Sequence, residues 1–365
     1  MPPPYKGASK GPAVAELQPG QTIQSIFLVQ SKDVREKKTG EPYLSLILMD
    51  RTGELDAKMW DNVANVMDTF DRSDFVRVKG VTQLYQNRTQ LTIHALTPVD
   101  GAEVDITEFL PASRRDPEEM MAELRGIIGS MNSEPLKALL ESMFADPAVA
   151  QGFMRAPAAK SIHHAWLGGL LEHVLSLCAL ARPLAKHYGN IDEDLLIAGC
   201  ILHDIGKISE LSYSRAFGYT TEGQLLGHMQ IALRIVADHL PPGFPPKLRN
   251  LLEHLILSHH GQLEFGSPKV PLFPEALLLH HMDNMDSKME TMRASIEKDK
   301  SNSGEWTGYN YALERSVLDK DKYLAGSPPK PEPRQPAGKP APPARSGSLF
   351  GEALQSAYSN VKEKA

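Results

Sequence analysis

The histidines constrain the fold of this chain more than any other residue type. Of the 13 histidines, all but His94 fall between His163 and His281, in about a third of the sequence. Neutral imidazole is the side chain that most often ligates transition metals in proteins. A lone polar group among apolar residues is costly, so binding of a shared ion explains the clustering best. This part of the chain must therefore fold so that several segments converge on a metal site.

The composition is that of a globular protein in a reducing compartment. With 365 residues, 41% of them hydrophobic and 23% charged, the chain can bury about two domain cores. A net charge of −6 argues against coating nucleic acid by bulk charge but leaves room for a local basic groove. Cys178 and Cys200 fit buried, reduced thiols. Because we find no membrane-length apolar run and no secretory signal, we expect a cytoplasmic protein without a membrane partner.

A small β-barrel is predicted for residues 13–104, after a flexible lead-in over 1–12. Five short runs alternate between apolar and polar residues and are bounded by turn residues, which is typical of strands. They cover 22–30, 43–49, 53–60, 75–84 and 89–96. Apolar residues at helical spacing predict one helix over 61–71, between the third and fourth strands. This order of elements is that of an OB-fold.

The rest of the folded chain is predicted to be helical. We assign 105–160 to a linker and helical connector, 161–322 to an all-α domain, and 323–365 to a disordered Pro-rich tail with a short terminal helix that could dock on a protein partner. Apolar residues recur every three or four positions in seven segments. These segments are 117–131, 134–144, 164–187, 192–204, 223–240, 246–259 and 274–297.

One dipeptide stands out as a metal-binding motif. In Leu202-His203-Asp204-Ile205-Gly206-Lys207 an imidazole and a carboxylate are adjacent near the end of a predicted helix. Such a pair can bind one metal while the second carboxylate oxygen bridges to another. Further candidate ligands, each in an otherwise apolar helical stretch, are His173, His228, His259, His260 and Asp283.

The order of these residues resembles that of a known family. His, His-Asp, His, His-His and Asp on successive helices, over about 160–290, is similar to the HD-domain metal-dependent phosphohydrolases. The OB-fold, the linking Phe109-Leu110-Pro111, the upstream His163-His164 and the downstream Leu257-Ser258-His259-His260-Gly261 resemble more narrowly the YhaM-type 3′-to-5′ exoribonucleases, over about 15–320. The resemblance implies a barrel that holds single-stranded RNA or DNA and an HD site that removes nucleotides from the 3′ end with divalent metal.

The same resemblance implies a role for each ligand. Two divalent ions are expected, typically Mn²⁺, with Mg²⁺, Fe²⁺ and Co²⁺ as alternatives. The first would be held by His173, His203, Asp204 and Asp283. Asp204 would bridge to a second, held by His228, His259 and His260. The catalytic side chains would be Asp204, Lys207 against the phosphate, and His164 at the phosphate or leaving group, with His163 as its alternative. Lys207 could instead be an ordinary solvent-facing lysine at a helix end.

On the barrel, one face carries aromatic and basic side chains. Tyr43, Lys58 and Trp60 alternate with residues predicted to be buried. Single strands bind OB-folds by stacking bases on aromatic rings beside cations. Loop residues expected to line the same groove are Lys37, Lys38, Tyr85 and Arg88. The alternative is that Trp60 caps the barrel core and the lysines are solvated loop charges.

Two other functions stay open at this stage. The HD site could act on a small nucleotide or cyclic dinucleotide, with the barrel as a sensor or oligomerisation domain. The segment after His260 lacks the extra sequence of the cyclic-dinucleotide type, which argues against that reading. A non-catalytic nucleic-acid-binding scaffold would need a decayed ligand set, whereas the set is complete. The sequence is also compatible with a homo-oligomer.

Overall fold

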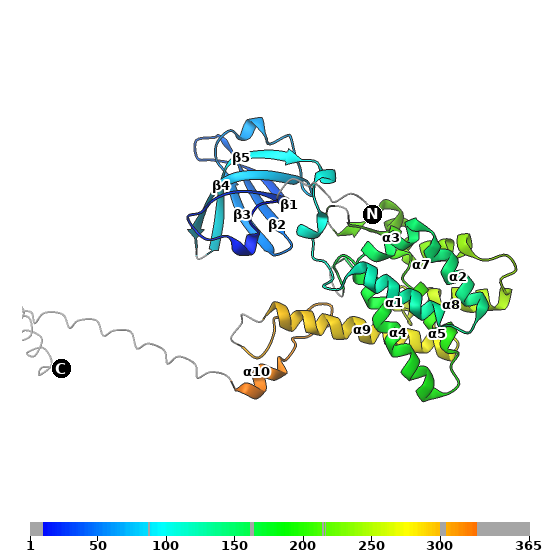
Figure 1. The fold of residues 1–365 in the computed structure, drawn as a ribbon. Helices are drawn as coiled ribbons and strands as arrows, with labels where there is room; N and C mark the ends of the chain where they lie inside the picture. The colour runs from blue at the N-terminus through cyan, green and yellow to red at the C-terminus, as the bar shows by residue number, and fades with distance from the viewer. Residues whose placement is uncertain are drawn as a thin grey trace, which may run out of the picture.

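The computed structural model describes residues 10–86, 88–160, 164–213, 215, 217–299 and 304–326. A barrel is followed by a helical domain, and α9 (Pro274–Lys298) runs from that domain toward the barrel side of the molecule (Figure 1). His163, nearly all of the predicted lead-in and the predicted tail from residue 327 lie outside the described residues. Within the described part, no helix is long and apolar enough to cross a membrane.

The N-terminal part is a closed five-stranded barrel with the order β1-β2-β3-β5-β4. Its strands are β1 (Thr22–Glu36), β2 (Pro42–Asp50), β3 (Gly53–Met59), β4 (Phe75–Tyr85) and β5 (Arg88–Val99). Parallel pairing of β3 with β5 closes the barrel, and the other neighbours are antiparallel. Alternation fills the interior because Leu44, Leu46 and Leu48 point inward and are fully buried. The predicted OB-like barrel is confirmed, with β1 longer than expected.

The helix predicted over 61–71 is wrong. Only the single 3-10 turn η2 (Val63–Asn65) forms there, preceded by Asn62 in the left-handed conformation with φ 58°. Val63 and Phe70 are buried in the barrel core, and Val66 and Met67 pack against it. The apolar residues of this segment therefore belong to a loop that covers the barrel. The segment is too short to form a stable helix by itself.

The helical domain is built around one large core. Its helices are α1 (Pro117–Gly129), α2 (Glu134–Ala145), α3 (Pro147–Arg155), α4 (Gly169–Tyr188), α5 (Glu193–Leu202), α6 (Lys207–Glu210), α7 (Thr221–His239), α8 (Pro246–Ser258) and α9. A short hairpin, β6 (Leu211–Ser212) and β7 (Gly218–Tyr219), follows α6, and α10 (Lys320–Ala325) follows α9. Helices α1 to α3 share the core of the later helices. The seven predicted helical segments are confirmed, while α3, α6 and α10 were not predicted.

Helix α5 lies at the centre of this core and positions the predicted metal motif. Every residue from Leu195 to Leu202 is buried, so the helix is apolar on all sides. The Asp192 side chain caps its first turn by accepting from the Leu195 amide. His203 and Asp204 come directly after the last turn, where they are held inside the domain.

The helix predicted from 164 begins later than expected. Gly168, with φ 78°, precedes α4, so the segment 164–168 is a loop. His164 itself has φ 44° and therefore does not lie two and a half helical turns before His173, as its helical placement implied. A short segment in which Gly168 adopts the left-handed conformation cannot continue the helix toward the N-terminus.

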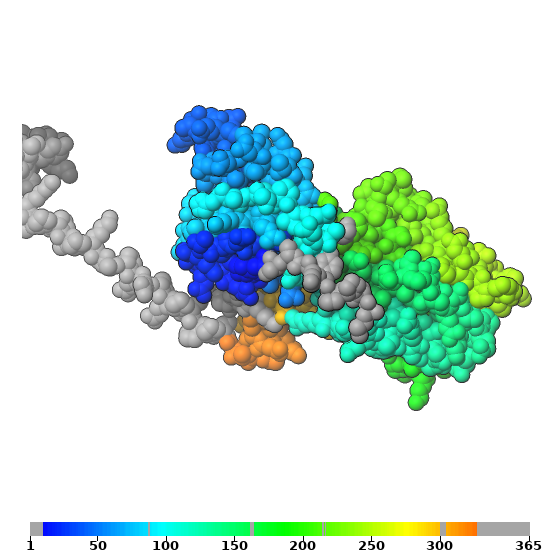
Figure 2. All heavy atoms as spheres, turned by 45° about the horizontal axis from the view of Figure 1, so that its top comes forward, coloured from blue at the N-terminus to red at the C-terminus, as the bar shows by residue number. Residues whose placement is uncertain are grey.

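An apolar cluster joins the two domains. Ile26, Leu28 and Phe75 of the barrel pack with Phe109, Leu110 and Leu167. The rings of Phe75 and Phe109 meet edge to face, with centroids 4.8 Å apart. In Figure 2 the barrel surface lies directly against that of the helical domain. The connector is therefore packed against both domains along this stretch.

Candidate metal centre

Separate elements of the helical domain bring all the predicted ligands to one place. His173 lies on α4, His203 and Asp204 follow α5, His228 lies in α7, His259 and His260 follow α8, and Asp283 lies on α9. On one side of this site, His173 Nε2 is 3.2 Å from Asp283 Oδ1. His203 Nε2 is 3.3 Å from Asp204 Oδ2 and 3.9 Å from Asp283 Oδ1. The four residues proposed for the first ion are thus adjacent.

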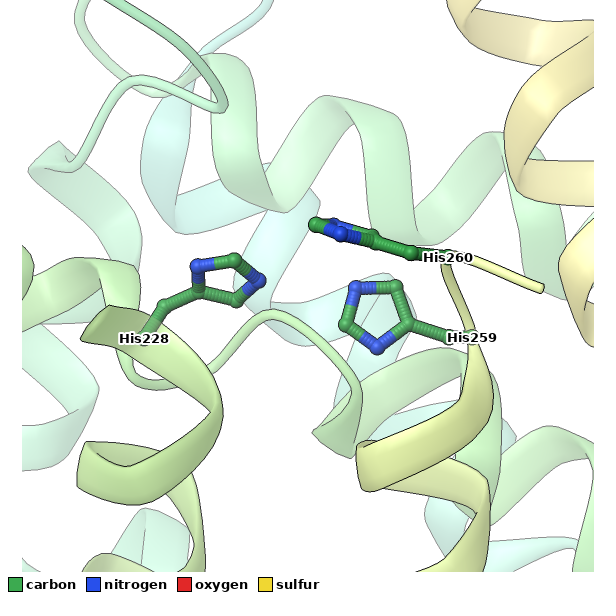
Figure 3. Close-up of side chains that lie close together, drawn as sticks. All are labelled: His228, His259 and His260. Carbon is green, nitrogen blue, oxygen red and sulfur yellow. The ribbon is translucent and has the colours of Figure 1, made fainter. Parts of the chain in front are cut away.

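The second group of ligands lies on the other side of Asp204. Asp204 Oδ1 is 3.5 Å from His228 Nε2 and 3.7 Å from His259 Nε2. Each of His228, His259 and His260 has a ligand atom within 4.8 Å of the others. Figure 3 shows the ring of His228 facing those of His259 and His260 from a separate helix. The two carboxylate oxygens of Asp204 therefore face two different groups of imidazoles.

Each imidazole is oriented by a partner on its Nδ1 atom. The contacts are His173 to Asp286 Oδ2 at 2.8 Å, His203 to the Cys200 carbonyl at 2.9 Å, His228 to Glu210 Oε1 at 3.1 Å, His259 to the Ile256 carbonyl at 2.7 Å and His260 to the Phe265 carbonyl at 3.0 Å. A donor at Nδ1 leaves a lone pair on Nε2, as in metal-ligating histidines. The contacts at Nδ1 thus leave Nε2 of each of the five rings as the atom that can bind a metal.

The buried atoms at the centre fit a divalent cation. Among the described residues, the buried atoms without a hydrogen-bond partner include Nε2 of His203, His228 and His259, and Oδ1 of Asp204. Buried polar atoms are normally hydrogen-bonded, because leaving one unsatisfied costs free energy. Imidazole nitrogens beside both oxygens of a carboxylate form a donor set suited to Mn²⁺, Fe²⁺, Co²⁺ or Zn²⁺. The residues present therefore fit a metal centre.

The electrostatics of the site largely favour ligation. Burial lowers the pKa of His259 well below its ordinary value, and neighbouring His203 adds to this. Burial would raise the pKa of Asp204, but the charges of Lys207 and His203 outweigh it and hold that pKa well below its ordinary range. For His173 the lowering by burial is outweighed by hydrogen bonds with Asp283 and Asp286, which raise its pKa to about 9. A cation at His173 must therefore compete with a proton.

Two carboxylates that support the ligands were not predicted as site residues. Asp286 contacts His173, accepts from Ser176 Oγ at 2.5 Å, and lies 3.3 Å from His164 Nε2. Glu210 Oε1 accepts the backbone amide of His228 at 3.0 Å as well as contacting its ring. Asp286 follows Asp283 by one helical turn, a spacing that could have indicated it. We see no comparable sequence signal for Glu210.

The two other predicted catalytic side chains lie at the edge of the centre. Lys207 Nζ is 2.6 Å from Asp204 Oδ2, a contact that the sequence prediction did not include. His164 lies beside Asp286, with its ring 5.6 Å from that of His173. Another histidine, His280, lies with its Nδ1 2.8 Å from the His259 carbonyl. It thus helps to fix the backbone that carries the His-His pair.

Comparisons with known proteins match this architecture. A family model described as an OB-fold nucleic acid binding domain matches residues 29–99, and an HD domain model matches 170–288. The 3′-5′ exoribonuclease YhaM of Bacillus subtilis (strain 168) is 38% identical over 308 residues, which cover 83% of this chain and 96% of that protein. The chain belongs to the YhaM family. Another member, from Geobacillus sp. (strain WCH70), is 35% identical over 305 residues, 82% of this chain and 92% of that protein.

In this YhaM-family chain, the barrel brings together some of the residues predicted to bind nucleic acid. The rings of Tyr43 and Trp60 stack with centroids 4.6 Å apart, and Trp60 is 40% exposed. Lys58 Nζ donates a hydrogen bond to Ser45 Oγ at 2.5 Å. Lys37 Nζ lies 3.7 Å from Asp61 Oδ1.

The remaining three predicted residues lie at other positions on the barrel. Tyr85 and Arg88 face each other across the β4–β5 hairpin. Lys38 lies in the exposed turn between β1 and β2. Trp60 is 40% exposed and is not part of the buried barrel core, so it does not cap that core.

Proposed function

We propose that this chain is a metal-dependent exonuclease that removes nucleotides from the 3′ end of single-stranded RNA, and also of single-stranded DNA. The observation that carries the proposal is the position of Asp204, whose two oxygens face two groups of imidazoles. Two cations sharing one carboxylate suit the hydrolysis of a phosphodiester. The names of the YhaM relatives and their long alignment with this chain supply the polarity and the substrate.

The chain's own residues would hold and tune this chemistry. We propose two ions, Mn²⁺ in the native enzyme, with His173, His203, Asp204 and Asp283 at one and Asp204, His228, His259 and His260 at the other. When bound, such ions activate a water and neutralise the charge on the phosphate. Lys207 adds a cation beside Asp204, where it would face the phosphate. His164, which contacts Asp286, would exchange a proton with the leaving group.

The barrel would hold the strand while the helical domain cleaves it. We propose that residues 13–104 bind the strand, with Tyr43, Trp60 and Tyr85 stacking bases and Lys37, Lys38, Lys58 and Arg88 beside its phosphates. Residues 161–322 would carry the chemistry. The exposed ring of Trp60 and the ligands of the metal centre support this division.

One assay tests the proposal directly. A 5′-labelled single strand is incubated with purified protein and Mn²⁺, or with a chelator. We expect the label to shorten one nucleotide at a time only with metal, and a stable hairpin at the 3′ end to block the reaction. The Asp204→Ala variant, checked for an unchanged fold, should lose the activity. Release of a labelled mononucleotide as first product, or equal degradation of a blunt duplex, would overturn the polarity or the substrate.

A further inference from the structure

A cavity lies beside the metal centre, at the junction of the two domains. Its volume is about 1260 Å³, and six parts of the chain line it. These are the β2–β3 turn at Arg51 and Thr52, the connector from Pro111 to Arg115, Glu123 of α1, the loop with His164 and Trp166, one face of α4, and the C-terminal half of α9. Pockets for one small ligand usually measure about 300–1,000 Å³. This cavity is therefore large enough for more than one nucleotide.

Helix α9 runs from the metal centre into this cavity. Asp283, which lies beside His173 and His203, is followed on the same helical face by the cavity-lining residues Asp286, Glu290, Arg293 and Glu297. Helix α4 does the same, because Ser176 lines the cavity one turn after His173. One end of the cavity thus reaches the residues that orient the ligands, and the other end reaches the barrel.

Five acidic and five basic side chains line the cavity, and the acids have partners within the protein. Of its acidic side chains, Glu123 pairs with Arg115, Glu290 pairs with Arg293, and Glu172 accepts from the Trp166 indole at 2.8 Å. Asp286 is engaged by His173, His164 and Ser176. Arg51 and Arg114, in contrast, have no ion pair among the described residues. Two exposed guanidinium groups therefore face the cavity from the barrel and the connector.

Other residues that line the cavity offer flat and apolar surface. Trp166, Leu175 and Met289 line it, and Met289 is 56% exposed. The Trp166 ring is held by its bond to Glu172, so its plane is fixed before any ligand binds. Arginines that can bind phosphate and a held indole in the same cavity match the needs of a single strand with unstacked bases.

We propose that the nucleic-acid strand passes from the barrel to the metals through this cavity, with its phosphates against Arg51 and Arg114 and its bases against Trp166 and Met289. The inference rests on the proposed function and adds the route. It makes Arg51 and Arg114 binding residues that the sequence did not indicate.

The route can be tested by strand binding without hydrolysis. Arg51→Ala and Arg114→Ala are compared with the matched control Arg234→Ala, an exposed arginine of α7 that pairs with Glu222 outside the cavity. Affinity for a single-stranded RNA of about 20 nucleotides is measured with chelator at several salt concentrations. Removing one cation that neutralises a phosphate of a single strand lowers the slope of log affinity against log salt by about 0.7. We expect that change, and several-fold weaker binding, in both cavity variants and neither in the control.

Two results would overturn the route. One is a salt slope in both cavity variants equal to that of Arg234→Ala. The other is that a mononucleotide binds in a way that needs Arg51 and Arg114 and is not displaced by the strand, because the occupant would then be a small nucleotide. Failure of the wild-type protein to degrade any strand with metal would instead refute the proposed function, since strand binding is measured separately from hydrolysis.

Discussion

The Asp286 carboxylate contacts Nδ1 of His173, on the side of the ring away from Nε2. Replacing Asp286 should weaken metal binding, although Asp286 is not itself a predicted ligand. In Asp286→Asn the His173 ring loses a charged acceptor, and such supporting contacts are worth about 10–100-fold in metal affinity or activity. We expect a loss of that size in Mn²⁺ affinity, measured by titration of the metal-free protein. Asp238→Asn, an exposed carboxylate of α7, is the control and should bind metal normally. Unchanged affinity in Asp286→Asn would mean that the orientation of His173 does not depend on this contact.

The ligands themselves could be predicted from the sequence, whereas their supports could not. A histidine in an apolar helix is conspicuous, because its polarity contradicts its surroundings. Glu210 gives no such signal, since a glutamate near a helix end is ordinary. Its role depends on the packing of α6 against α7, which brings it to His228 from a different element. Contacts of this kind appear only when the helices are placed in space.

A kink inside α7 depends on Gly227. Its φ of 72° and ψ of 158° lie in a region that is essentially restricted to glycine, and the next residue is His228. Gly227→Ala should lower the free energy of unfolding by about 1–3 kcal/mol. It should also displace His228 and reduce the number of bound metal ions. Denaturant unfolding and metal analysis measure the two effects.

The matched control for this change is Gly126→Ala. Gly126 lies within α1 and has no neighbouring atom within 4 Å of an added Cβ. That variant should be as stable as the wild type, or more stable by about 0.5–1 kcal/mol. Equal behaviour of the two variants would show that α7 tolerates a regular helix at this position.

Asp50 ties the segment before the barrel to its second strand. Burial would raise its pKa, but hydrogen bonds from Lys10 and Thr52 outweigh this and lower the pKa below its ordinary value. A lowered pKa contributes stability above pH ~4, which is lost as the pH falls through the folded-state value. Asp50→Asn should therefore be less stable by about 3 kcal/mol at pH 7, since it leaves Lys10 without its buried partner. The difference from wild type should shrink near pH 3, as followed by denaturant unfolding at each pH.

At the level of helices and strands, periodicity predicted the long elements and failed on short ones. The five strands and seven helical segments carry enough apolar repeats to determine their type. The stretch from 61 to 71 has the same repeats, but its side chains fill the open end of a barrel. Helix α3 is short and follows α2 after a single residue, Asp146, whose side chain caps it. A boundary set by one capping residue is easily missed in a sequence.

The barrel and the metal centre should contribute separately to activity on long strands. Trp60→Ala removes one ring of the Tyr43–Trp60 stack, and stacking of a base on an aromatic ring contributes about 1–3 kcal/mol. Binding of a strand of about 20 nucleotides should weaken by roughly fivefold to hundredfold. Hydrolysis of a dinucleotide should change much less. Tyr188→Ala, at the exposed end of α4, is the control, and an equal loss on both substrates would assign Trp60 a structural role.

The order of the two domains followed from the sequence, but their contact did not. Phe109 and Leu110 were recognised only as part of a connector. In the structure they are buried between the barrel and the helical domain. Sequence periodicity reports which face of an element is apolar, and does not report which domain covers it. Deleting the barrel would expose these residues, so point variants test its role more cleanly.

The packing of Phe75 on Phe109 fixes the distance between the barrel and the helical domain. The barrel is anchored to the connector, and the same cluster includes Leu167, two residues before the helix that carries His173. The distance from the Tyr43–Trp60 ring pair to the metal centre is then fixed. A strand longer than this distance binds both the barrel and the metal centre. A strand shortened below it binds only at the metal centre. Digestion should slow sharply at one residual length, the same for starting strands of every size, and that length measures the distance.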